Sequence, residues 1–495
     1  MDKNFLFRRQ FILSSNPEHK FENWVNINLD KDIFLSVHPD LEVAQSTKGE
    51  LQLTLLGFAV NPFEPDKSNN QILDKMLENE VSFEEIIRKT EPLGGRWIII
   101  YKDKDSILVF NDPCSNRQVY YHKELVNRVL CGSDPAILNY FIKLEKDESP
   151  EIAEVLNNPL FEIKEKAWAG SSTIFKGVEH LMPNHYLDIR KKSITRFWPY
   201  KPIEKIDFKK AVDICSEILR GSLLAINNRQ KLAIAVTAGW DSRVLLAASK
   251  DICKEATYFV SVKGDNPEKH HDVAVPIKLF QKLGLPFYVQ DCNQEIEPEF
   301  KKIIESNVAI SRTYLHKAKN IYKYYLDFNG MMSVNGNVSE IGRLCIRPMF
   351  PQKISGDNLI KLNYFSYGGS YFASQFNQWI DEIKPYCEQN NLNIYDMLYW
   401  EQRMGNWGAV YPSEQDIAID QFSPFNNRLL LSTMLSIDEK YRKYPQHRLH
   451  YKIIEKLWPE TLLEPVGVAP FKSKVKKDIK HLLTDIFNLI PVFEK

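Results

Sequence analysis

The sequence has no excess of charge of either sign. Its 64 Lys and Arg residues balance 64 Asp and Glu residues over 495 positions. Proteins whose main role is to hold nucleic acid usually carry a basic excess, because they must neutralise phosphate groups. The balance therefore excludes a general polyanion-binding protein and leads us to expect no nucleic-acid partner, although it leaves room for a local basic site.

Cysteine is scarce and unpaired in sequence. There are seven cysteines, and none forms a C-x-x-C pair. This spacing supports neither a zinc site nor a dithiol centre. We expect mostly buried, free thiols in a reducing cytoplasm.

Long hydrophobic runs are also missing. The first residues, M-D-K-N-F-L-F-R-R, lack the apolar segment and small-residue cleavage site of a signal peptide. The strongest apolar runs, 97–101 and 232–236, have the length of strands and are far too short to span a membrane. We therefore expect a cytoplasmic protein with no membrane partner.

The first part of the chain is rich in strand patterns. The expected strands are 52–60, 96–101, 106–110, 118–122, 186–189 and 194–197. The composition changes around Trp198–Pro202, where Pro and aromatic residues interrupt the pattern. We predict one domain over 1–200 and a second over 205–495.

In the second part, helices and strands alternate. Apolar spacing predicts a helix over Phe208–Asn227, and the all-apolar run Leu232–Val236 is typical of a buried parallel strand. Further helices are expected over 242–249 and 272–283, with strands over 256–262 and 287–289. The alternation predicts a doubly wound α/β domain, followed by a mainly helical part from about Ile360 onward.

The turn after the strand 232–236 carries the most chemical information. Small residues there let a phosphate group approach the backbone, and the N–H groups of a helix start point at it. Thr237 and Ser242 supply hydroxyls, and the carboxylate of Asp241 could hold Mg²⁺. The alternative is an ordinary strand-to-helix turn in which Asp241 or Ser242 caps the helix.

This turn, T-A-G-W-D-S-R, resembles the S-G-G-x-D-S pyrophosphate loop of N-type ATP pyrophosphatases, and most closely that of the asparagine synthetase and β-lactam synthetase family. It lacks the G-K-[ST] of a Walker A loop. The resemblance implies an adenine nucleotide α-hydrolase-like fold and a set of nucleotide-binding residues, which are Thr237, Ala238, Gly239, Trp240, Asp241, Ser242 and Arg243.

A second segment, 331–340, resembles the family's S-G-x-G-x-D-E motif. The resemblance implies that Asn335 and Gly336 bind nucleotide, and that Glu340 joins Asp241 as a magnesium ligand. The match is loose, because Val338 replaces the second glycine and Ile341 the final Glu. The alternative is a capped loop before a short helix.

Two further family positions concern catalysis. Glu401 and Arg403 lie in a segment that resembles the family's E-x-R-M, with either a substrate role or a place in a structural ion pair between helices. Pro465 stands where the family often has a lysine, so we expect Lys472 or Lys474 to supply the positive charge instead. The alternative for these lysines is the solvated face of a tail helix.

The N-terminal part resembles class II glutamine amidotransferase domains. Leu93–Tyr101 is similar to L-x-G-x-F-A-x-x-x-Y, and Asn111–Tyr121 to R-D-x-x-G-x-x-P-L-Y-Y. The resemblance implies an Ntn-type αββα sandwich. That family uses a cysteine at the mature N-terminus as nucleophile, whereas here Met1 precedes Asp2. We therefore expect no glutamine hydrolysis and a structural role for Asp112.

Together these resemblances imply a carbon–nitrogen ligase that uses ATP and Mg²⁺. It would adenylate a small-molecule or peptide carboxylate and transfer the acyl group to an amine or to ammonia. The alternatives are an ammonia-dependent asparagine synthetase, base- or tRNA-modifying chemistry on the same fold, and a non-catalytic member of a biosynthetic complex. Neutral charge and the lack of paired cysteines count against the nucleic-acid option. Partner proteins and homo-oligomerisation stay open.

Overall fold

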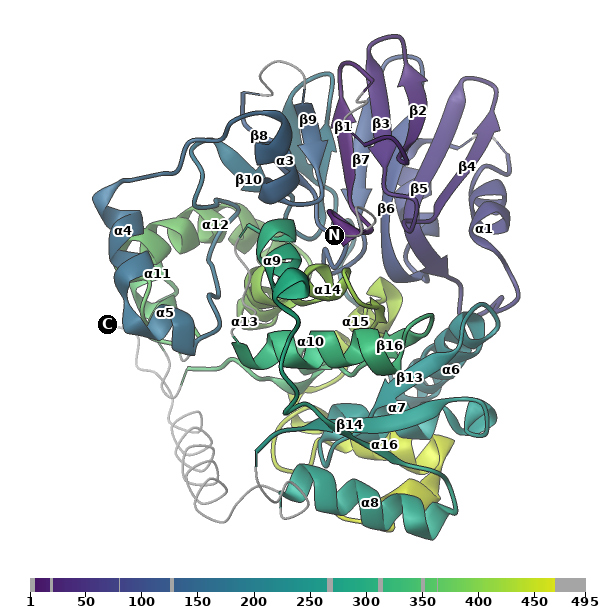
Figure 1. Ribbon diagram of the computed structural model, residues 1–495. Helices are drawn as coiled ribbons and strands as arrows, with labels where there is room; N and C mark the ends of the chain where they lie inside the picture. The colour runs from purple at the N-terminus through teal and green to yellow at the C-terminus, as the bar shows by residue number, and fades with distance from the viewer. Residues whose placement is uncertain are drawn as a thin grey trace.

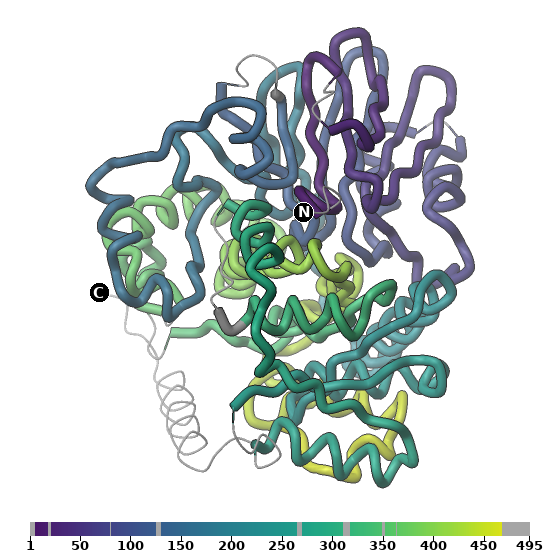
Figure 2. The backbone as a smooth tube through the Cα atoms, in the orientation of Figure 1, coloured from purple at the N-terminus to yellow at the C-terminus, as the bar shows by residue number. Residues whose placement is uncertain are grey.

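The computed structural model describes residues 5–17, 21–79, 81–124, 129–264, 270–309, 315–348, 352–362 and 364–467 (Figures 1 and 2). Two antiparallel sheets form the upper part of the molecule in Figure 1, and a parallel sheet with its helices forms the lower part. Within the described ranges, no helix is both long enough and apolar enough to cross a bilayer.

Each of the two antiparallel sheets has six strands. The first has the order β10 (Val178–His180), β8 (Tyr120–His122), β9 (Val129–Gly132), β1 (Phe11–Ser14), β3 (Ile33–Val37) and β2 (Val25–Asp30). The second has the order β12 (Ser193–Arg196), β11 (His185–Asp188), β7 (Ile107–Asn111), β6 (Gly94–Lys102), β5 (Leu51–Val60) and β4 (Val43–Lys48).

The two antiparallel sheets pack face to face. Alternate residues of a strand point to opposite sides of its sheet, so one face of each sheet packs on the other sheet and the opposite face packs on helices. In β6, Ile98 and Ile100 join a core shared with β1 and β3, whereas Trp97 and Ile99 face the helices α1 (Asn69–Met76) and α2 (Phe83–Lys89). On the outer side of the first sheet lies α3 (Pro135–Phe141). The layers are therefore helix, sheet, sheet and helix.

The third sheet has five parallel strands. Their order is β15 (Tyr288–Asp291), β14 (Thr257–Val262), β13 (Leu232–Ala235), β16 (Met332–Val334) and β17 (Asp420–Phe422). Leu232 and Ile234 face a core with α6 (Phe208–Asn227), α7 (Trp240–Ala248) and α16 (Arg448–Leu457), whereas Ala233 faces α9 (Pro298–Asn307) and α10 (Leu315–Asp327). Helices therefore cover both faces, as the alternation predicts.

The strand order places a topological switch point beside β13. From β13 the chain first crosses to β14 on one side, and it later returns to β16 on the other side. In open α/β sheets, ligands bind at such a point, outside the carboxyl ends of the strands. The segments that follow β13 and β16 are the two motifs that the sequence singles out.

The remaining elements are mostly helical, which agrees with the expectation for the C-terminal part. In chain order they are α4 (Pro150–Asn157), α5 (Pro159–Ile163), η2 (Lys250–Ile252), α8 (His271–Leu283), η4 (Ser339–Arg343), α11 (Gly356–Leu359), α12 (Gly369–Gln389), α13 (Ile394–Met397), the π-helix η5 (Leu398–Gly408), α14 (Ala409–Gln415), α15 (Arg428–Leu435), η6 (Glu439–Tyr441) and η7 (Pro459–Leu462).

Buried ion pairs join the antiparallel sheets to the rest of the molecule. Arg96 Nη1 lies 2.5 Å from Asp416 Oδ1 and 2.9 Å from Asp420 Oδ1. Arg117 Nη2 lies 3.2 Å from Asp420 Oδ2. The side chains of both arginines are at most 2% exposed. These four residues, Arg96, Arg117, Asp416 and Asp420, are called the inter-sheet charge cluster below.

Candidate functional site

The loop after β13 turns directly into α7. The helix begins at Trp240, two residues before the predicted start, with Gly239 as an N-cap that offers no side chain to the first N–H groups. Thr237 and Ser242 hold the turn together, since Thr237 N donates to Ser242 Oγ at 3.1 Å and Gly239 N donates to Thr237 Oγ1 at 3.2 Å. The helix start is therefore open to an anion.

The segment after β16 packs directly on this loop. Asn335 N donates to Phe422 O at 3.2 Å, which ties the segment to β17, and Asn335 Oδ1 accepts from Asn337 N at 3.1 Å. A Cβ atom at Gly336 would lie 2.6 Å from Asp241 Cβ and 3.0 Å from the Asp241 carbonyl carbon. Only glycine fits this approach without displacement, so the two predicted motifs are in direct contact.

Asp241 and Glu340 face each other across this contact. Burial, and then the negative charge of Asp241, raise the pKa of Glu340 to about 7. Arg343, at the end of η4, lies beside both acids: its Nη2 is 2.7 Å from Asp241 Oδ2 and 3.9 Å from Glu340 Oε1. The structure thus brings together the two residues that were predicted to bind metal and adds a cation that was not predicted.

The donor set of this acid pair fits a hard divalent cation. Asp241 Oδ1 and Glu340 Oε2 are buried, and neither has a hydrogen-bond partner among the described residues. Carboxylate oxygens are the ligands that Mg²⁺ prefers. Buried carboxylate oxygens without partners are costly, so a cation would relieve them.

His450, on α16, lies beside the acid pair. Its Nε2 lies 2.8 Å from Ser339 Oγ and 3.9 Å from Asp241 Oδ1. Burial lowers the pKa of His450 well below its usual range, and the charges of Arg343, His447 and Arg442 lower it further. The imidazole is therefore neutral near the acid pair, and Arg343 supplies the positive charge there.

Arg243 does not point into the loop, contrary to its predicted role. Its guanidinium is buried and donates to the carbonyl oxygens of Thr461, Glu464 and Pro465 at 2.5, 2.8 and 3.2 Å. Beyond these contacts, Gly467 N donates to Ala238 O at 2.8 Å. The guanidinium of Arg243 therefore fastens the C-terminal segment 459–467 beside the loop, and these contacts favour a structural role over the predicted contact with the nucleotide.

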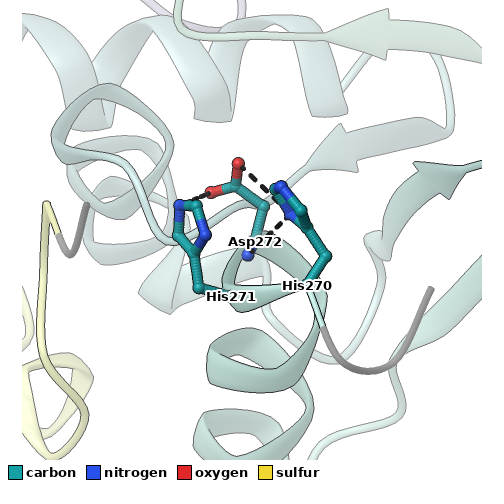
Figure 3. A group of neighbouring side chains, drawn as sticks. All are labelled: His270, His271 and Asp272. Atoms are coloured by element: carbon teal, nitrogen blue, oxygen red, sulfur yellow. Dashed lines mark hydrogen bonds and ion pairs between the residues drawn. The ribbon is translucent and has the colours of Figure 1, made fainter. Parts of the chain in front are cut away.

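A further group of polar side chains lies at the start of α8 (Figure 3). Ligand atoms of His270, His271 and Asp272 all lie within 4.8 Å of one another, so the group could hold a metal ion. Asp272 Oδ1 also accepts a hydrogen bond from Ala238 N at 3.2 Å. Asp272 thus contacts the loop, and it was not singled out from the sequence, although α8 follows β14, the neighbour of β13, and so starts at the same edge of the sheet.

Glu401 is a fully buried member of an ion pair. Its carboxylate accepts from Arg196 Nη1 at 2.6 Å, from Trp379 Nε1 at 2.8 Å and from Asn184 Nδ2 at 2.9 Å. The partner is Arg196 of β12, whereas the guanidinium of Arg403 lies over the rings of Trp407 and Tyr364. A carboxylate with no exposed surface and three protein donors favours the structural alternative over a substrate role.

Lys472 and Lys474 lie outside the described residues, so their predicted role stays a prediction. The described chain ends at Gly467, which contacts the loop.

The cysteines that the structure describes at the N-terminal sheets, Cys114 and Cys131, are buried free thiols. All seven cysteines are free, and Cys114 is fully buried, which raises the pKa of its thiol well above the usual value. The neighbouring Asp112 carboxylate accepts from Asn116 N, Arg117 N and Asn426 Nδ2 at 2.9, 2.8 and 2.7 Å. These contacts describe a structural role for Asp112.

No protein-family model matches this chain, and no curated protein matches it. Among solved structures, it is similar to NMN synthetase from Francisella tularensis, with 13% identity and a TM-score of 0.21 over 40% of this chain and 94% of that one. It is also similar to glutamine phosphoribosylpyrophosphate amidotransferase from B. subtilis in complex with ADP and GMP, with 12% identity and a TM-score of 0.24 over 68% and 70% of the two chains. Both TM-scores are too low to bear on fold or function.

Proposed function

We propose that this chain is an ATP- and Mg²⁺-dependent ligase that activates a carboxylate as an acyl-adenylate and transfers the acyl group to an amine or to ammonia, without hydrolysing glutamine. The proposal assigns the ATP-dependent step to residues 205–495, as an adenine nucleotide α-hydrolase-like unit. It assigns residues 1–200 to an Ntn-type sandwich without a nucleophile.

One observation supports the proposal above all. Two motifs that are far apart in the sequence, Thr237–Ser242 and Asn335–Glu340, meet at the carboxyl ends of adjacent parallel strands, with Gly336 packed on Asp241. This edge is the switch point of the sheet, where ligands of doubly wound folds bind. The open start of α7 and a pair of acids for a metal lie there together.

In this proposal the loop binds the pyrophosphate part of ATP. The backbone N–H groups of Ala238, Gly239 and the first turn of α7 donate to phosphate oxygens, and the hydroxyls of Thr237 and Ser242 complete the cradle. Trp240, the first residue of α7, and Asn335, which follows β16, would complete the nucleotide site. Asp241 and Glu340 would hold Mg²⁺, which supplies charge neutralisation to the leaving pyrophosphate. The acyl acceptor then attacks the activated carbon, a step that depends mainly on positioning.

Isotope exchange between ATP and pyrophosphate tests the first step. Exchange should appear with one or more compounds from a panel of carboxylic acids, including aspartate, and it should fall at least about a hundredfold in Asp241→Asn and Glu340→Gln. Asp251→Asn is the matched control, because Asp251 pairs with Arg220 on the surface of the molecule. Exchange with no acid, or exchange that survives Asp241→Asn unchanged, would contradict the proposal. Formation of asparagine from aspartate and ammonia would identify the asparagine synthetase alternative.

A second candidate, a non-catalytic member of a biosynthetic complex, is favoured by one specific feature. Groups that would bind nucleotide already have partners within the chain: Ala238 N donates to Asp272, and Asp241 pairs with Arg343. Calorimetric titration with ATP, with and without Mg²⁺, separates the two candidates. Mg²⁺-dependent binding supports the enzyme, and absence of binding supports the non-catalytic alternative.

A further inference from the structure

We infer that Arg343 is the internal counter-ion of the Asp241–Glu340 pair, that a divalent metal displaces it, and that the displaced guanidinium then binds the polyphosphate of the nucleotide. This inference rests on the proposed function and goes beyond it by assigning a residue that neither motif contains. It makes Arg343 a phosphate-binding residue of the loaded site and a competitor of the metal in the empty one.

The contacts of Arg343 place it on the same carboxylates as the proposed metal. Its Nη2 is 2.7 Å from Asp241 Oδ2 and 3.9 Å from Glu340 Oε1, and its side chain is only 16% exposed. The two acids direct their other oxygens, Asp241 Oδ1 and Glu340 Oε2, into the interior without hydrogen-bond partners. Arg343 thus covers one side of the acid pair and leaves the other side without a donor.

The charge balance favours exchange with a divalent ion. Metal binding requires both carboxylates in their ionised form, in which they carry two negative charges, and one guanidinium compensates only one of them. The nearby imidazole of His450 makes its hydrogen bond with Ser339 Oγ at 2.8 Å, and its Nε2 stays 3.9 Å from Asp241 Oδ1. A divalent cation balances both carboxylates at once, and Arg343 is then left as an uncompensated, largely buried cation.

An anion beside the loop would compensate that cation. The guanidinium offers five donors in a planar fork that matches phosphate oxygens, and Arg343 Nε has no partner among the described residues. Arg343 sits at the end of η4, which follows the segment that packs on the loop through Gly336. A small movement of the side chain therefore suffices to exchange a carboxylate for a phosphate oxygen on the same loop.

Metal binding without nucleotide gives the sharpest test. In Arg343→Met the competing cation is absent, so Mn²⁺, measured by calorimetry or by its electron paramagnetic resonance signal, should bind about tenfold more tightly than in the wild type. In the same variant, ATP in the presence of saturating Mg²⁺ should bind about tenfold more weakly. Opposite changes in the two affinities are not expected of a residue that only supports the fold.

Two further variants serve as controls. Arg343→Lys keeps the charge, so its metal affinity should stay within about twofold of the wild type while its nucleotide affinity falls part of the way. Arg347→Met removes an arginine that pairs with Asp396 and Glu439, away from the acid pair, and both affinities should stay at the wild-type values.

The outcomes separate this inference from the proposed function. If the wild type binds Mg²⁺ and ATP, but Arg343→Met binds Mn²⁺ no more tightly or ATP no more weakly, the role of Arg343 is wrong and the proposed function stands. If the wild type binds neither ligand, both are wrong. Circular dichroism melting confirms that each variant is folded before its affinities are compared.

Discussion

At the scale of single residues, Asp272 Oδ1 accepts a hydrogen bond from Ala238 N, at 3.2 Å, in the proposed phosphate loop. Phosphate would have to take that N–H group and would meet the negative charge. Asp272→Asn keeps an acceptor and removes the charge, so calorimetry should show ATP binding several-fold more tightly. Asp251→Asn removes a surface charge and should change nothing. Weaker binding in Asp272→Asn would show that Asp272 helps to hold the nucleotide.

Gly336 tests the contact between the two motifs. In Gly336→Ala the new Cβ would come within 2.6 Å of Asp241 Cβ, so the two segments must separate. We expect ATP affinity to fall by about tenfold or more and the melting temperature to fall by several degrees. Gly94→Ala is the control, since its Cβ would make only ordinary contacts of 3.4 Å and more. Unchanged nucleotide affinity in Gly336→Ala would mean that the two motifs do not act as one site.

At the scale of elements, α7 connects the loop to the C-terminal segment through Arg243. Arg243→Met removes three charge-assisted hydrogen bonds to the carbonyls of Thr461, Glu464 and Pro465 and should destabilise that segment by about 2 kcal/mol. Thermolysin, which cleaves before apolar residues, should then cut near Leu462 and Leu463 faster than in the wild type.

The control for this experiment is Lys282→Met. Lys282 pairs with Glu464 of the same segment, but it is half exposed, so the pair contributes little. Equal cleavage rates in Arg243→Met and the wild type would show that the segment does not depend on Arg243.

The same elements show how much of the structure can be predicted from the sequence. The apolar pattern predicts α6 to the residue and β13 to within one residue, because burial of one helical stripe leaves a periodic pattern and burial of a strand on both faces leaves a continuous apolar run. The two loop motifs are identified through their resemblance to a family, since the local pattern alone leaves an ordinary strand-to-helix turn open. The direction of Arg243, the partner of Glu401 and the presence of Arg343 and Asp272 in the site are not found, since each depends on a contact between segments distant in sequence.

At the scale of the whole molecule, several buried ion pairs between the first part of the chain and the later part have the arginine on the first part and the acid on the later part. In the inter-sheet charge cluster, the antiparallel sheets supply Arg96 and Arg117, and the part that follows supplies Asp416 and Asp420. Arg196 and His185 likewise meet Glu401 and Glu382 of the later part. In these pairs the cation comes from the earlier part and the acid from the later part, whereas Lys317 and Glu165 pair in the opposite sense.

Removing one cation from the inter-sheet charge cluster should lower the free energy of unfolding strongly. Arg96→Met leaves Asp416 and Asp420 short of a buried partner, and we expect a loss of about 3–5 kcal/mol in the free energy of unfolding, followed by urea denaturation. The double variant Arg96→Met/Asp416→Leu removes the pair together and should recover much of that loss. No recovery in the double variant would mean that Arg96 acts by packing and not by its charge.

Low pH should weaken the contact of Glu382 with His185 and Arg196. Although burial acts to raise it, His185 and Arg196 hold the pKa of Glu382 at about 2, against an ordinary value of 4.5. An acid with a lowered folded pKa adds stability above its unfolded pKa and loses it as the pH falls towards the folded one. The melting temperature should therefore drop between about pH 5 and pH 3. Glu382→Gln should flatten this drop, and an identical pH profile in that variant would rule out its contribution.

The ion pairs across this contact also bear on what residues 1–200 contribute to the rest of the chain. If residues 205–495 were expressed alone, Asp416, Asp420 and Glu401 would lie on a surface that the whole chain buries. The arginines that pair with these acids in the whole chain would be missing. The sandwich then serves the rest of the chain as a permanently attached folding partner. The arginines at the contact would then be retained for solubility alone, whatever reaction the chain carries out.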